Sequence, residues 1–183
     1  QSQVLHNHAS DRVLPEGGML LIDSGAETTE GYASDITRTL PISGTFTEKQ
    51  REIYDTVLTA QKHAIDTAHA GMTMKQLHLE AARKMTEGLI DLGIMRGNAD
   101  QAVAAGAHAL FFPHGLGHML GVDVHDMEDL GDIVGYGPDA SRDTQFGLSN
   151  LRMARELEIG FSFTIEPGLY FIEALIDQWA KEK

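Results

Sequence analysis

Three carboxylates stand in stretches of this sequence that are otherwise apolar or strand-like. Asp23 ends a short apolar run, and Asp35 lies in the β-prone stretch Tyr32–Ile42. Glu166 is followed directly by a proline. A carboxylate in such surroundings is costly unless a cation or hydrogen-bond donors compensate for the lost water. Taken together, the three residues are candidate metal ligands.

Each carboxylate also has an ordinary explanation. Turn chemistry would account for Asp23, and a surface salt bridge would account for Glu166. An ion pair between Asp35 and Arg38 is disfavoured, because residues three apart on a strand point to opposite faces.

Three of the nine histidines, His114, His118 and His125, fall within twelve positions. Gly115 and Gly117 separate the first two and disfavour a helix, so this is not the helical zinc motif. Glycines at these positions let the backbone approach another group closely. Hydrogen bonds to the backbone would explain any one of these histidines better than all three.

Two aspartates, at least one histidine and a glutamate form a suitable ligand set for two divalent ions roughly 3.5–4 Å apart. Such ions lower the pKa of a shared water from 15.7 toward about 7, and the hydroxide can then attack an amide carbonyl. Neutral histidines nearby can donate hydrogen bonds to the oxyanion. The chain has no cysteine, which excludes thiolate zinc sites and cysteine nucleophiles. Oxygen-rich sites favour ions such as Mn²⁺.

The elements that must position these residues begin with two strands. Met19–Asp23 is expected to be a buried strand, and Tyr32–Ile42 a second strand, joined as a hairpin by residues 24–31. In such a hairpin Asp23 and Asp35 could lie side by side, and their mutual repulsion would require a cation.

Helices are expected to follow the hairpin. Capping boxes at Thr47 and Thr73 each predict a helix start, with ends near Gly71 and Gly93. A short helix is expected at Ala99–Ala105.

Beyond these helices the helical pattern fades. Phe111–His125 is expected to be strand and turn, Asp126–Asn150 an irregular loop, and Phe161–Ile172 a strand interrupted at Pro167. This order predicts an α+β fold with a curved antiparallel sheet backed by helices.

Composition bounds the function further. The formal charge of −13 repels phosphate backbones, so nucleic acid is not an expected partner. No apolar run approaches the length of a membrane span, so a membrane partner is not expected either. The 183 residues are enough for one domain and too few for two ordinary ones.

Four segments of the chain, in order, resemble the pita-bread (creatinase/aminopeptidase) metallopeptidases, in particular the aminopeptidase P and prolidase branch. The resemblance extends from about Leu5 to Trp179 and rests on Ile22–Glu27, Gly31–Thr39, Pro113–His118 with Val124–Asp126, and Thr164–Gly168. It implies a pita-bread fold and two divalent metal ions, usually manganese with cobalt or zinc as substitutes.

The resemblance also implies a role for each candidate ligand. Asp23 would bind one metal through both oxygens, and Asp35 would bridge the two metals. His118 and Glu166 would hold the second metal, and Glu166 would also shuttle a proton.

Three further histidines receive roles in the same way. His114 and His125 would bind substrate or stabilise the oxyanion. His6 matches a histidine that lines the same site.

The activity implied is hydrolysis of the Xaa-Pro bond at the N-terminus of dipeptides or longer peptides, by a cytoplasmic homodimer. Methionine aminopeptidase and creatinase-like hydrolase are rival enzymes, but Pro113–His118 and Leu169–Trp179 resemble prolidase more closely. The alternative from another class is a metal-depleted pita-bread module that binds proteins or peptides.

Three departures from the family pattern qualify this expectation. Nothing matches the family's later bridging glutamate, for which Glu173 would be a poor substitute on a continuous strand. The separate N-terminal domain of this branch is missing, and the interval from Asp23 to Asp35 is one residue longer than usual. Residues 1–183 are therefore expected to be a single catalytic domain without the upstream domain and the last strands, and to bind metal weakly.

Overall fold

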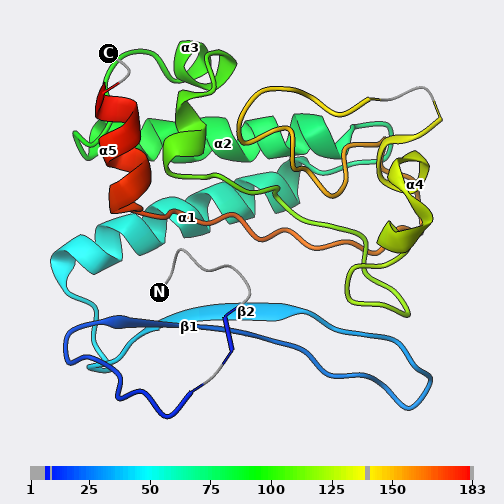
Figure 1. Cartoon of the computed structure of the whole chain (residues 1–183), viewed down its shortest axis with the longest axis horizontal. Coiled ribbons are helices and arrows are strands. Elements are labelled where there is room, and N and C mark those ends of the chain that lie inside the picture. The colour runs from blue at the N-terminus through cyan, green and yellow to red at the C-terminus, as the bar shows by residue number, and fades with distance from the viewer. Residues whose placement is uncertain (1–6, 9, 139–140, 182–183) are drawn as a thin grey trace.

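The hairpin and the helices form separate layers in the computed structural model, which describes residues 7–8, 10–138 and 141–181. Figure 1 shows the long helices α1 and α2 stacked above the two strands, with α5 standing beside them. The elements are β1 (Met19–Ser24), β2 (Ile36–Pro41), α1 (Glu48–Thr67), α2 (Met74–Asp91), α3 (Ala99–Ala104), the 3₁₀ turns η1 (Ala107–Leu110) and η2 (Glu128–Leu130), α4 (Asp132–Tyr136) and α5 (Glu173–Lys181).

Both capping boxes are confirmed. The Thr47 and Thr73 side chains accept hydrogen bonds from the backbone N–H three residues later, and a glutamine side chain returns the bond in each case. Helix α2 ends close to the predicted Gly93, whereas α1 ends at Thr67, earlier than expected. The helix ends because Ala68 adopts an extended conformation, and Gly71 N–H beyond it donates to the Leu157 carbonyl.

The hydrophobic core lies between α1, α2 and the C-terminal half of the chain. The predicted inner face of α2 is confirmed, because Leu77, Ala81, Met85 and Leu89 are all buried. Ala60 and Ala64 present small side chains on α1, which lets the two helices pack closely. This helical layer is the rigid base on which the candidate site rests.

The hairpin is confirmed, with β1 and β2 antiparallel and Asp23 paired with Thr37. Burial of β1 was a wrong prediction, because most of its residues are exposed. Ile22, Ile36 and Leu40 are 43%, 52% and 50% exposed. They lie on the face opposite Asp23, so about half of each side chain on that face is open to solvent.

Strand β2 is shorter than predicted. Asp35 lies just before the strand and not within it. The chain before Asp35 is bonded to the histidine-rich segment and not to β1. Ala33 N–H donates to the Gly121 carbonyl at 2.8 Å, which ties the hairpin to the histidine-rich segment.

The predicted strands at Phe111–His125 and Phe161–Ile172 are absent as continuous strands from the described residues. The two segments nevertheless run antiparallel, with N–H to carbonyl bonds from Leu120 to Ser162, Thr164 to His118, and Glu166 to Leu116. At His118 the ladder is interrupted because His118 N–H donates to the Thr164 hydroxyl instead of the Thr164 carbonyl.

The remaining differences concern short helices. Residues 126–150 contain η2 and α4, where an irregular loop was predicted. Glu173 begins helix α5 and does not continue a strand, so its side chain lies on neither strand face. The α+β class is confirmed, with a sheet of two strands in the described part of the chain. Within that part no helix has the length and apolar character needed to cross a membrane.

A histidine lies at the centre of the core. His78 is fully buried on α2, stacks on Phe112 with ring centroids 4.9 Å apart, and has no hydrogen-bond partner for either ring nitrogen. Burial, with smaller electrostatic contributions from His108, His114 and Lys75, lowers the pKa of His78 to about 3. The ring is therefore neutral in the folded protein.

This core histidine predicts acid sensitivity. Because the unfolded chain protonates His78 near pH 6.5 and the folded chain does not, stability is lost as the pH falls below 6.5. Replacing His78 with leucine should reduce the slope of unfolding free energy against pH by about 1.4 kcal/mol per pH unit in this range. Urea unfolding at several pH values measures the slope, and an unchanged slope would contradict the prediction.

Candidate metal centre

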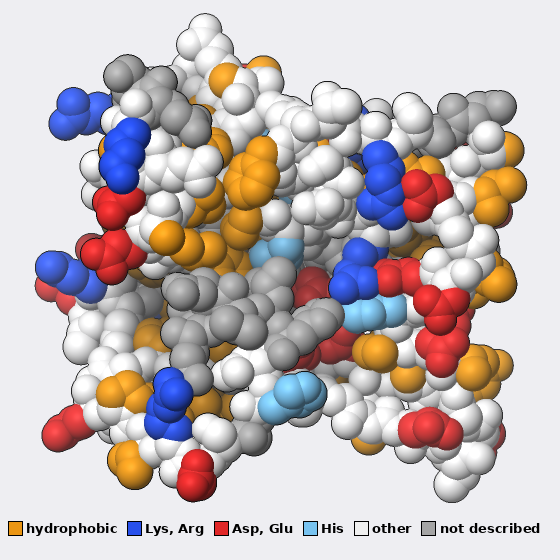
Figure 2. All heavy atoms as spheres, viewed as in Figure 1, with side chains coloured by type: hydrophobic (Ala, Val, Ile, Leu, Met, Phe, Trp, Pro, Cys, Tyr) orange, Lys and Arg blue, Asp and Glu red, His pale blue; other side chains and the backbone are white. Residues whose placement is uncertain are grey.

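Asp35, His118 and Glu166 meet at the junction of the two layers. Each offers a ligand atom, and these atoms lie within 4.8 Å of one another. Their side chains are 13%, 5% and 32% exposed, respectively. Figure 2 shows histidine and acidic side chains gathered near the middle of the molecule, between the helical layer and the hairpin.

The hairpin register places the two aspartates on one face. Asp23 is paired with Thr37, and Asp35 lies two residues before Thr37, so both carboxyls project on the same side. The Asp23 carboxyl group lies close enough to Asp35 to raise the pKa of Asp35. A Cβ at Gly25 would come within 1.7 Å of the Ser34 carbonyl oxygen, so this close approach requires glycine.

A second close approach positions His118 and Glu166. A Cβ at Gly117 would lie 2.0 Å from the Thr164 carbonyl oxygen, so glycine is required here too. It allows segment 116–120 to run against segment 162–166. The pairing brings the His118 ring to 3.1 Å from both Asp35 Oδ2 and Glu166 Oε1.

The donors of this cluster fit a divalent cation. His118 Nδ1 lies 2.9 Å from the Met119 carbonyl oxygen, which can only accept, so Nδ1 carries a proton. In the neutral ring Nε2 is then a lone pair, and it faces two carboxylate oxygens. Three electron-rich atoms this close repel one another unless a proton or a cation lies among them. Imidazole nitrogen with carboxylate oxygen is a ligand set that Mn²⁺ or Zn²⁺ accepts.

The same proximity changes the protonation of the cluster. Burial, the Asp23 hydrogen bond and the charges of Glu166 and Asp23 raise the pKa of Asp35. Burial opposes protonation of His118, but hydrogen bonds to Glu166 and Met119, with the charges of Glu166 and Asp35, leave its pKa raised. Burial likewise opposes ionisation of Glu166, but hydrogen bonds from His118 and Thr164 leave its pKa lowered. In the absence of metal these shifts favour a proton on His118 beside an ionised Glu166.

The other predicted residues surround this cluster at different distances. Asp23 adjoins Asp35 but lies outside the group of three converging ligand atoms. The His125 ring meets the His118 ring edge to face, with centroids 4.4 Å apart. His114 Nδ1 lies 2.7 Å from the Gly115 carbonyl, and its Nε2 is buried without a hydrogen-bond partner. His6 lies outside the described residues.

Sequence reasoning missed three residues that contact the cluster, its supporting segment or the neighbouring His114. The Thr164 hydroxyl contacts His118 and Glu166, and Gln61 Nε2 donates from α1 to the Ile165 carbonyl at 3.1 Å. The Tyr170 ring packs against His114 with centroids 5.2 Å apart. Thr164 could have been found, because a residue two before Glu166 on an extended segment shares its face.

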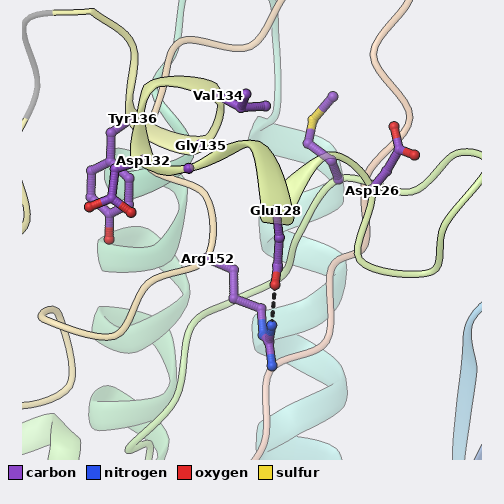
Figure 3. Close-up of a pocket in the computed structure, with 9 residues that line it drawn as sticks. Asp126, Glu128, Asp132, Val134, Gly135, Tyr136 and Arg152 are labelled. Carbon is purple, nitrogen blue, oxygen red and sulfur yellow. Dashed lines mark hydrogen bonds and ion pairs between the residues drawn. The ribbon is translucent and has the colours of Figure 1, made fainter.

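A hollow beside the site is too small for a peptide. It encloses about 20 Å³ between Met119 and η2–α4, with Asp126, Tyr136 and Arg152 in its wall (Figure 3). That volume holds about one water. The ion pair between Glu128 and Arg152 crosses this region and links η2 to the loop that carries Arg152.

Comparison with known proteins gives a consistent result. Residues 1–181 match metallopeptidase family M24. The chain is 44% identical over 170 residues to Xaa-Pro aminopeptidase of Haemophilus influenzae and 40% identical over 181 residues to human Xaa-Pro dipeptidase. These matches cover 93% and 97% of this chain but 35% of each relative. The chain thus spans about a third of the length of the curated relatives it matches.

The chain is also similar to solved structures of Escherichia coli aminopeptidase P. A histidine-to-alanine variant gives a TM-score of 0.76 at 40% identity, covering 92% of this chain and 34% of that one. A zinc-substituted form in complex with product gives a TM-score of 0.74 at 38% identity, with the same coverage. Further variants replace a histidine, an aspartate or a glutamate with alanine. These are the residue types of the candidate set.

The raised pKa of Asp35 predicts opposite effects of one substitution on stability and metal binding. A folded-state pKa above 3.8 stabilises the protein only at low pH, and that stability is lost as the pH rises through the folded pKa. Asp35→Asn should therefore stabilise the metal-free chain at pH 7 and not at pH 3. It should weaken Mn²⁺ binding by more than the roughly 10–100-fold that loss of an outer-shell partner costs.

Urea unfolding in EDTA and calorimetric titration measure the two effects. Exposed Asp66 provides the control, because Asp66→Asn should change neither. Destabilisation of the Asp35→Asn variant at pH 7 would contradict the explanation.

The raised pKa of His118 predicts that metal competes with a proton. Binding requires the Nε2 lone pair, so the apparent Mn²⁺ affinity should fall by up to about tenfold per pH unit below that pKa. Titrations in buffers of different ionisation enthalpy should detect about one released proton per bound ion in that range. Affinity that is independent of pH between about 5 and 8 would contradict the assignment.

Proposed function

Since this chain belongs to metallopeptidase family M24, we propose that it forms the metal-binding part of an exopeptidase that hydrolyses the Xaa-Pro bond at peptide N-termini. The observation that carries the proposal is the convergence of Asp35, His118 and Glu166 from three segments distant in sequence. Relatives named Xaa-Pro aminopeptidase and Xaa-Pro dipeptidase support the substrate class.

We propose two divalent ions, most often manganese. Asp35, His118 and Glu166 would hold one ion, and Asp23 together with Asp35 would hold the other. When bound, these ions would supply Lewis-acid activation of a water and of the substrate carbonyl. The hairpin and the paired segments 116–120 and 162–166 would belong to the curved sheet of a pita-bread fold.

Glu166 is suited to moving a proton. Its lowered pKa keeps it ionised at neutral pH, and Thr164 and His118 occupy Oε1. Oε2 can accept the proton of the attacking water and return it to the leaving imino nitrogen of proline.

His114 is suited to orienting the substrate. Because Nδ1–H donates to the Gly115 carbonyl, the buried Nε2 is a lone pair. Burial lowers the pKa of this ring, against the opposing effects of the Gly115 bond and the Glu166 charge, so it stays neutral. Nε2 would accept an N–H bond from the peptide. His125 would hold the His118 ring in place from the side.

The test is hydrolysis in the presence of Mn²⁺ of an Xaa-Pro dipeptide and an Xaa-Pro-Xaa tripeptide, with the Xaa-Ala analogues as controls. The chain, or a longer natural form that contains it, should cleave only the proline peptides. Glu166→Gln should lower kcat by about 10²–10⁴-fold with little change in fold. Glu158→Gln, which alters a surface ion pair with Arg155, is the matched control and should leave kcat unchanged.

A folded, Mn²⁺-loaded protein that cleaves neither peptide would contradict the proposed activity. That outcome would favour a module that binds peptides without cutting them. Sedimentation of the same preparation would test the homodimer that we also propose.

A further inference from the structure

The hydroxyl of Thr164 lies between two members of the metal cluster. Thr164 Oγ1 is 3.0 Å from the backbone nitrogen of His118 and 2.6 Å from Glu166 Oε1. Thr164 is neither a metal ligand nor an acid–base group in the proposed function, and its side chain carries no charge.

The direction of both hydrogen bonds is fixed by chemistry. The His118 N–H can only donate, so the hydroxyl oxygen accepts there. The hydroxyl proton is then free to point at Glu166, whose ionised carboxylate can only accept. A bond from a hydroxyl to a carboxylate is charge-assisted, and 2.6 Å lies in the range of such bonds. Thr164 thus links a backbone group of one ligand to the side chain of the other.

The Thr164 hydroxyl also takes part in the backbone pairing between the two segments. Thr164 N–H donates to the His118 carbonyl at 2.9 Å, and a regular antiparallel pair would return a bond from His118 N–H to the Thr164 carbonyl. That return bond goes to the Thr164 hydroxyl instead. The Thr164 carbonyl is directed at Gly117, which has no side chain to obstruct it. The hydroxyl therefore replaces one backbone bond between the two segments. Its second bond fixes the position of the Glu166 carboxylate relative to His118.

Glu166 needs such a restraint. Its side chain is the most exposed of the three, and an unrestrained glutamate carboxylate would rotate away from Asp35 and the His118 lone pair. The Thr164 bond holds Oε1 at 3.1 Å from His118 Nε2 and leaves Oε2 available. Gln61 anchors the intervening Ile165 carbonyl from α1, so the Thr164–Glu166 segment is fixed on both sides.

We propose that Thr164 is a positioning residue of the metal centre, whose hydroxyl sets the Glu166 carboxylate in register with His118 before a cation binds. This role rests on the metal centre of the proposed function but not on the peptide that it cuts.

Two substitutions separate the hydroxyl from the shape of the side chain. Thr164→Val keeps the shape and removes the hydroxyl, whereas Thr164→Ser keeps the hydroxyl and removes a methyl group. The valine variant should bind Mn²⁺ about 10–100-fold more weakly in calorimetric titration, and the serine variant should bind within a few-fold of the wild type. Thr86 is the matched control, because it is buried and donates its hydroxyl to the Ala82 carbonyl far from the site. Thr86→Val should leave Mn²⁺ affinity unchanged.

A measurement without metal tests the same link. Amide hydrogen exchange at His118 should accelerate roughly 3- to 10-fold in Thr164→Val and remain slow in Thr164→Ser. Wild-type affinity and wild-type exchange in the valine variant would overturn the proposal, as would equal losses in the serine and valine variants. A wild-type chain that takes up no Mn²⁺ would overturn both this role and the metal centre. Mn²⁺ binding without peptide cleavage would overturn the proposed activity alone, and the contrast between valine and serine would still decide the role of Thr164.

Discussion

Repulsion among three acceptors is the constraint on which this structure depends. The lone pair of His118 Nε2 lies 3.1 Å from a carboxylate oxygen of Asp35 and 3.1 Å from one of Glu166. Water cannot screen these partly buried groups well. A proton on the ring relieves the repulsion in the metal-free state, and a divalent cation can relieve it more completely. Folding thus assembles an arrangement of acceptors that is unfavourable when neither a cation nor a proton is bound. The surrounding chain must hold it in place by contacts that do not involve these charges.

Those contacts come from the backbone and from the helical layer. At Gly25 and Gly117 the chain comes so close to a neighbouring carbonyl that no larger residue fits. The first contact shapes the end of the hairpin that carries Asp35, and the second brings His118 against the Glu166 segment. Helix α1 adds the Gln61 bond to that segment. The charged atoms are therefore placed by groups that carry no charge.

The elements that depend on local chemistry were predictable from sequence. The capping boxes at Thr47 and Thr73 begin helices as expected, because both partners lie within one turn. Asp35, His118 and Glu166 stood out as polar residues in apolar surroundings, and the structure brings them together. Their roles as ligands stay predictions.

The failures concern features that tertiary contacts decide. The apolar pattern of β1 indicates a strand but cannot say whether another layer covers it. The strand expected at Phe161–Ile172 lacks a regular ladder, and at His118 the missing backbone bond goes to the Thr164 hydroxyl, which no periodicity reports.

The exposed face of the hairpin, with Ile22, Ile36 and Leu40, has a further consequence. Among the described residues neither strand has a further strand beside it, and unpaired strand edges are a template for pairing between molecules. The charge of −13 at neutral pH keeps copies apart, and this protection disappears near the pI of 4.9. Mild acid or high salt would thus favour association of molecules through the hairpin. The strands that position the aspartates therefore also govern the colloidal stability of the chain.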